Sequence, residues 1–146
     1  MEFRVAASNE ELSKCIKQIS AWDGKTRLAV EDALRKGTKA VQRQAIQRVA
    51  VRTKRLKKSI KQSFSTTKLE GRVYSNLPYA HLVEYGSRAT VIRPKRKKAL
   101  KIPYGNGFTF AKRANIPAKA PHPFMKPAYE YEEPHIIAAV RRAITK

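Results

Sequence analysis

The 146-residue sequence has little of what disulfide chemistry, membrane insertion or export would require. Its single cysteine, Cys15, excludes an internal disulfide and a cysteine-based metal site, and it fits synthesis in a reducing cytoplasm. No stretch approaches the roughly 20 apolar residues of a membrane span. The amino terminus also lacks the apolar run of a signal peptide. We therefore expect no membrane partner and no export by that route.

Acidic residues are scarce, with 11 Asp and Glu against 32 Lys and Arg, which gives a formal net charge of +21. Residues 33–69 hold 12 basic residues and no acid, and residues 85–129 hold 11 and no acid. Such blocks bind polyanions, bind acidic proteins, or keep a concentrated protein in solution by repulsion. Composition alone does not decide among these three interpretations. The candidate polyanion contacts are Arg93, Lys95, Arg96, Lys97 and Lys98.

The residue patterns of enzymes are also missing. His81, His122 and His135 do not have the spacing of metal ligands. Gly105-Asn106-Gly107 lacks the third glycine and the following helix of a phosphate-binding loop, so it indicates a turn. We predict no enzyme and assign no catalytic, metal or cofactor-binding residue. A small basic nuclease is a weak alternative, because the few acids are too scattered for a metal-binding cluster.

Hydrophobic periodicity predicts a single α+β domain over residues 1–146. We expect a short strand at residues 2–5, a helix at 9–20, and a longer helix from an Asp23 cap to near Arg52. The expected apolar side of the longer helix is Ala29, Ala33, Val41, Ala45 and Val49. Residues 60–65 alternate with period two and residues 72–75 return after a turn, which predicts an antiparallel hairpin.

The second half of the chain predicts a short helix after Pro78 that stops at Gly86, and a second hairpin within residues 100–110. We expect residues 111–126 to be irregular, and a terminal helix with Pro134 in its first turn. Residues 87–126 would together form an extended basic arm. We expect the aromatic residues between the basic clusters, Phe108 and Phe110 among them, to fill the core and subunit contacts.

Three segments of the chain can be compared with a known family: residues 52–60, 79–88 and 123–128. Together they resemble the tail-completion, or head-tail joining, proteins of long-tailed bacteriophages. Segment 52–60, Arg-Thr-Lys-Arg-Leu-Lys-Lys-Ser-Ile, is similar to the family's Arg-Thr-Gly-x-Leu-x-x-Ser-Ile. Segment 79–88, Tyr-Ala-His-Leu-Val-Glu-Tyr-Gly-Ser-Arg, is similar to Tyr-Ala-x-x-Val-Glu-Phe-Gly-Thr-Arg. Segment 123–128, Pro-Phe-Met-Lys-Pro-Ala, is similar to Pro-Phe-Leu-x-Pro-Ala. Their order and spacing cover nearly the whole chain.

The residue types in these segments also have physical uses. Thr53 can cap a turn that points Leu56 and Ile60 to one side, into the core. Glu84 is the only acid between residues 71 and 129, so we expect it to pair with Arg52 or Arg88. Pro123 and Pro127 would hold Phe124 at a defined place. Lys54 stands where the family has glycine, so it is either strained or part of a turn of different shape.

The resemblance implies a non-enzymatic structural protein of the virion, made in the host cytoplasm, that forms a ring in the neck or tail. The ring would be a homo-oligomer, a hexamer with a dodecamer as the alternative, between the head-tail connector and the tail tube or tail terminator proteins. Nonspecific contact with double-stranded DNA in the channel fits the charge. The rival hypothesis is a basic nucleic-acid-binding protein. The structural and interface candidates are Arg52, Thr53, Leu56, Ser59, Ile60, Tyr79, Ala80, Val83, Glu84, Gly86, Arg88, Pro123, Phe124, Pro127 and Ala128.

Overall fold

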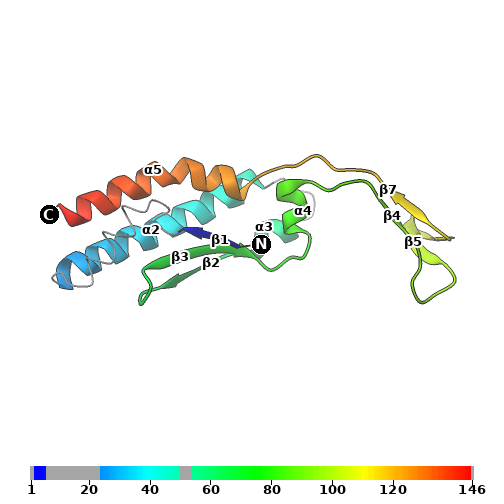
Figure 1. The fold of residues 1–146 in the computed structure, drawn as a ribbon, viewed down its shortest axis with the longest axis horizontal. Coiled ribbons are helices and arrows are strands. Elements are labelled where there is room, and N and C mark those ends of the chain that lie inside the picture. The colour runs from blue at the N-terminus through cyan, green and yellow to red at the C-terminus, as the bar shows by residue number, and fades with distance from the viewer. Residues whose placement is uncertain (1, 6–23, 50–53, 146) are drawn as a thin grey trace.

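A computed structural model describes residues 2–5, 24–49 and 54–145 of the chain. Two long helices and a three-stranded antiparallel sheet form a body, and a thinner extension with two small strand pairs projects from one end of it (Figure 1). The predicted α+β class and antiparallel sheet are therefore confirmed. The expected helix at residues 9–20 and the Asp23 cap lie outside the described residues.

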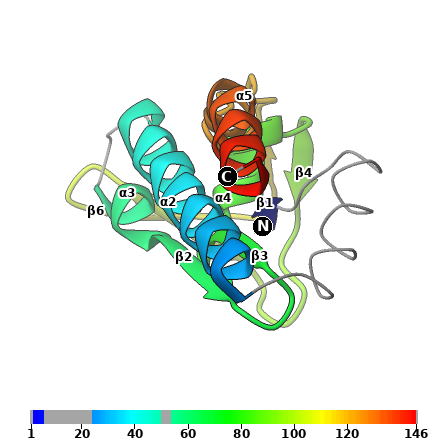
Figure 2. The ribbon, with the colours of Figure 1, turned by 90° about the vertical axis from the view of Figure 1, so that its left-hand side faces the viewer.

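The long helix α2 (Gly24–Arg48) lies across the sheet and forms the centre of the body (Figure 2). Val41 and Ala45 are buried as expected, and so is Val49 just beyond the helix end. The predicted stripe is wrong in the first half of the helix, where Ala29 is exposed and Ala33 is only partly buried. Val30 and Leu34 take the core positions instead. Their larger side chains remove more apolar surface from water than alanine can.

The sheet has the order β1-β3-β2, with β1 (Glu2–Val5), β2 (Ile60–Ser65) and β3 (Glu70–Ser75). The predicted hairpin is confirmed, since Ile60 pairs with Ser75 and Ser65 pairs with Glu70 in the antiparallel register. Gly71 of β3 lies directly against α2, where an added Cβ would be 1.8 Å from Thr38 Oγ1. Only glycine therefore permits this close approach of helix and sheet.

The terminal helix α5 (Met125–Ile144) packs along α2, as Figures 1 and 2 show from two directions. The two helices approach closely at Gly37 of α2, where a Cβ would be 2.5 Å from Ile136 Cγ1. The prediction for Pro134 is wrong, because α5 begins nine residues earlier and Pro134 lies inside it. Pro134 is exposed, so the carbonyl group left without an N–H partner one turn earlier can be hydrated.

The extension comprises residues 87–123 and leaves the body after α4 (Ala80–Tyr85). Its strand β4 (Thr90–Ile92) pairs with β7 (Ala114–Ile116), while β5 (Leu100–Tyr104) pairs with β6 (Gly107–Ala111). The hairpin at residues 100–110 is confirmed. The expectation of irregular chain over residues 111–126 is wrong where β7 forms and where α5 begins. The role of the extension as a basic arm stays a prediction.

Candidate interaction site

The described part of the first predicted segment, residues 54–60, forms the corner at which the chain enters β2. Its short helix α3 (Arg55–Ser59) follows Lys54, whose backbone is left-handed, with φ 55° and ψ −8°. Lys54 therefore adopts the conformation for which glycine is best suited, at a cost of about 1–2 kcal/mol for a residue with a Cβ. Its carbonyl accepts the Lys58 N–H at 3.0 Å. Lys54 therefore has the left-handed backbone expected of a glycine at this position, and it is strained.

Buried side chains hold this corner against the sheet. Leu56 and Ile60 both lie in the core, with exposed fractions of 7% and 3%. The Ser59 hydroxyl donates to the Leu56 carbonyl at 2.7 Å, so the Ser75 hydroxyl is the donor in its 2.7 Å contact with Ser59 Oγ. Ser75 Oγ in turn accepts the Leu77 N–H at 3.3 Å. The corner is thereby connected to the chain that leads into α4. Arg52 and Thr53 lie outside the described residues.

Glu84 of α4 is buried, with 2% of its surface exposed, and its carboxylate faces the start of α5. Its Oε2 accepts the backbone N–H groups of Phe124 at 2.8 Å and Met125 at 3.0 Å, and its Oε1 accepts that of Lys126 at 2.9 Å. The first N–H groups of a helix have no partner within the helix and carry partial positive charge, so a carboxylate satisfies both their hydrogen bonding and their dipole. Glu84 therefore caps α5 from another element.

This arrangement corrects one of the two arginine pairs expected of Glu84. Arg88 is exposed and forms no ion pair with it, and Arg52 lies outside the described residues. Across residues 24–49 and 54–145, no basic side chain pairs with Glu84. The backbone of the third segment instead provides its partners.

The base of the extension is fixed at Gly86, directly after α4. Its φ is 77°, and a Cβ there would lie 2.7 Å from the Lys119 carbonyl oxygen and 2.9 Å from the nitrogen of Pro121. Ser87 and Lys119 exchange two backbone hydrogen bonds of 3.0 and 2.8 Å, and the His122 N–H donates to the Val83 carbonyl at 2.8 Å. The outgoing and returning strands of the extension are thus joined where they leave the body. Only glycine fits this crossing.

The structure brings the second and third predicted segments together. Ala80, Phe124 and Ala128 are buried, while Tyr79 and Val83 are partly exposed and pack against the same core. Pro127 lies in the first turn of α5 and is partly buried, whereas Pro123 is exposed. The five candidate polyanion contacts from Arg93 to Lys98 are all exposed, and four of them lie in the bend between β4 and β5.

The expectation that Phe108 and Phe110 fill the core of the chain is wrong, because they are 60% and 69% exposed. Both lie on β6 in the extension, which places them far from α2 and α5 (Figure 1). Period-two alternation identified the strand, but it could not show whether anything covers its apolar face.

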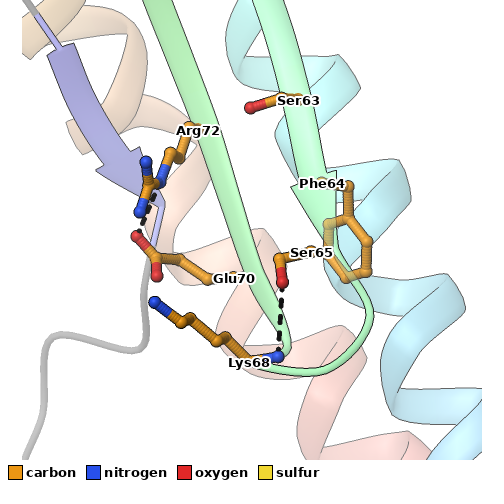
Figure 3. A pocket seen from close by; sticks show the side chains of 6 residues that line it. All are labelled: Ser63, Phe64, Ser65, Lys68, Glu70 and Arg72. Atoms are coloured by element: carbon orange, nitrogen blue, oxygen red, sulfur yellow. Dashed lines mark hydrogen bonds and ion pairs between the residues drawn. The ribbon is translucent and has the colours of Figure 1, made fainter.

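A shallow pocket of about 230 Å³ lies on the body at the turn between β2 and β3, lined by Ser63, Phe64, Ser65, Lys68, Glu70 and Arg72 (Figure 3). Its carboxylate, Glu70, accepts a hydrogen bond from Arg72 Nε at 3.1 Å. Within the described ranges no three His, Cys, Asp or Glu side chains gather to hold a metal ion, and no helix is long and apolar enough to cross a membrane.

Comparison with known protein families places this chain. Residues 13–86 match the family described as "Bacteriophage HK97-gp10, putative tail-component". The match covers half of the chain and includes α2, the corner, the hairpin and α4. The chain belongs to this family. No curated protein and no solved structure matches it. The match ends at Gly86, so the extension and α5 of this tail component lie beyond the matched residues.

Several residues that position the site were not found from the sequence. Gly37 and Gly71 set the spacing of the three layers, and Ser75 connects the corner to α4. The available signals were a glycine within a helix and a glycine within a strand. Because glycine destabilises both elements, its presence there suggests that another part of the chain comes close. No comparable signal marked Ser75.

Proposed function

We propose that this phage tail component is a non-enzymatic structural protein that completes the tail or joins it to the head, as one subunit of a ring. The family match over residues 13–86 carries this proposal. Supporting it, Glu84 of the second family-like segment accepts three backbone N–H groups of the third, and Ser59 of the first contacts Ser75, which precedes α4. A head-to-tail contact that closes on itself produces a ring, and a hexamer is the expected state, with a dodecamer as the alternative.

The partners in this proposal are the head-tail connector on one side and the tail tube or tail terminator protein on the other. The decisive experiment is to produce the phage without this protein and to examine particles by electron microscopy. We expect DNA-filled heads and separate tails that do not join, and restoration when the wild-type gene is supplied. Joined, infectious particles without the protein would contradict the proposal. Native mass spectrometry of the purified protein tests the ring and its subunit number.

A nucleic-acid-binding protein is the second candidate, favoured by the net charge of +21. Such a charge gives binding to any DNA at low salt, so this binding alone carries no functional meaning. For a structural component we expect sequence-independent binding that weakens with salt, with a log-log slope of about 0.9 per phosphate neutralised. Preference for one DNA sequence by at least about a thousandfold at physiological salt would favour the second candidate.

A further inference from the structure

Exposed apolar side chains gather in the extension. Six of the ten large hydrophobic residues that are exposed among the described residues lie there: Val91, Ile92, Tyr104, Phe108, Phe110 and Ile116. A concentration of exposed apolar side chains in one segment is typical of a site where another molecule binds. A pair of strands without further support is also only marginally stable in water. A partner that covers both strand pairs of the extension would therefore stabilise them.

The β5–β6 hairpin has one face that is especially suited to this. Directly opposed residues share a face, and the register pairs Lys101 with Phe110 and Pro103 with Phe108. The Lys101 ammonium lies 3.8 Å from the centre of the Phe108 ring. Tyr104 is on the opposite face, as the strand alternation requires. We call the first face, Lys101, Pro103, Phe108 and Phe110, the phenylalanine face.

The surroundings of this face carry charge of a single sign. Residues 87–123 contain ten basic residues and no acid, and none of these basic side chains forms an ion pair with another described residue. A partner that brings acidic side chains would neutralise this charge and speed the encounter. The extension of a second copy is a poor occupant, because it brings the same ten basic residues and no acid to the contact.

Duplex DNA also fits the apolar residues poorly. Phosphates would satisfy the cations, and single-stranded bases could stack on the phenylalanines. Neither a duplex nor a single strand of DNA offers a pocket for aliphatic side chains such as Val91 and Ile92 of the same extension, which are 56% and 41% exposed. A protein surface with acidic groups around apolar pockets satisfies both kinds of side chain.

The geometry points to a specific docking surface: the phenylalanine face binds an acidic protein surface with apolar pockets, on a virion protein other than this chain. This inference rests on the proposed role in the virion. The paired Ser87 and Lys119 backbones and the crossing at Gly86 hold the base of the extension on the body. The segment that carries the hairpin therefore leaves the body at a defined place, which lowers the entropy lost on binding.

The test uses heads and tails from cells producing the phage without this protein, with purified full-length protein added. The variant Phe108→Ser/Phe110→Ser should reduce joining at limiting protein at least about thirtyfold, as expected when a binding hot spot is removed. Tyr104→Ser, on the opposite face, is the matched control and should join like the wild type. Thermal melting and ring formation should be unchanged in both variants, because neither changes a core residue.

Crosslinking identifies the occupant. A photoreactive phenylalanine analogue at position 110 should attach the chain to a different virion protein, at a peptide rich in Asp and Glu, and the same analogue at position 104 should not. Crosslinks to a second copy, or loss of ring formation in the phenylalanine variant, would assign the face to self-association and overturn the inference.

DNA is tested by replacing Lys95, Arg96, Lys97 and Lys98 with Gln, using a random-sequence duplex as the probe. If this variant loses both duplex binding and joining while Phe108→Ser/Phe110→Ser joins normally, DNA is the occupant and the inference is wrong. We expect instead that the phenylalanine variant binds the duplex normally and fails to join. Should the wild-type protein itself not restore joining, the proposed function would fail before the docking surface is tested.

Discussion

Replacing Glu84 with Gln tests the central link of the structure with a change of very few atoms. Glutamine keeps the shape of the side chain but removes its charge and one of its two acceptor oxygens. In the wild type, Oε2 accepts two N–H groups, from Phe124 and Met125, and Oε1 accepts that of Lys126. In either orientation of the amide, its nitrogen would face at least one of these N–H donors. At least one N–H group at the start of α5 would then lack its acceptor, and the others would lose the charge of theirs.

The free energy of unfolding should fall by about 3 kcal/mol in Glu84→Gln, because hydrogen bonds to a charged group contribute about 1.5–3 kcal/mol each and are not additive. Glutamine can keep two of the three hydrogen bonds, now without the charge, so the loss is smaller than their sum. For a domain of this size about 3 kcal/mol corresponds to a fall of about 6–12 °C in melting temperature. Hydrogen exchange should quicken most at Phe124, Met125 and Lys126.

Equilibrium urea unfolding followed by circular dichroism measures the first effect, and hydrogen exchange with mass spectrometry measures the second. Glu130→Gln is the matched control, also on α5, because this exposed carboxylate lies 3.8 Å from Lys126 Nζ. An exposed ion pair contributes less than about 1 kcal/mol, so the control should be close to the wild type. If Glu84→Gln were as stable as Glu130→Gln, the capping role would be refuted.

The remaining predictions concern the corner, the core and the extension. Lys54→Gly should raise the free energy of unfolding by about 1 kcal/mol, because glycine relieves the strain of the left-handed backbone; a loss in urea unfolding would contradict this. Leu56→Ala and Phe124→Ala should each cost about 2–5 kcal/mol, and unchanged melting of both would place them outside the core. Limited trypsin digestion should cut first within residues 93–98, which are exposed apart from Pro94. Initial cutting within residues 29–49 would show that α2 is not the scaffold.

The hairpin of β2 and β3 could be predicted closely because its signals are local. Alternation over residues 60–65 and the turn before Gly71 specify both strands and their pairing. The strand β3 begins at Glu70, two residues before the predicted start. The buried stripe of α2 was predicted only in its second half, because helical periodicity allows several neighbouring faces. Packing against the sheet and α5 selects Val30 and Leu34 over the alanines beside them.

The start of α5 could not be predicted, because the group that stabilises it is 40 residues away. The sequence shows Pro134 as a suitable first-turn residue, but Glu84 supplies acceptors for the N–H groups of residues 124–126. Backbone N–H groups carry no sequence signal, so a carboxylate that binds them resembles one awaiting an arginine. The sequence likewise carries no signal of what covers Phe108 and Phe110. Their alternation is that of a half-buried strand, although the core of the chain covers neither of them.

The described acidic side chains are all paired with groups outside the extension, which leaves the positive charge of the extension without an acidic partner among them. Throughout the described side chains each Asp and Glu has a nearby partner: Glu31 with Arg35, Asp32 with Lys36, Glu70 with Arg72, Glu84 with the start of α5, Glu130 with Lys126, Glu132 with His135, and Glu133 with Tyr129. All of these partners lie in the body or at the start of α5, and none lies in residues 87–123. The charge of the extension therefore has no counterpart among these acids. Since like charges oppose close approach, a segment of this kind is most stable when its counter-charge comes from another molecule.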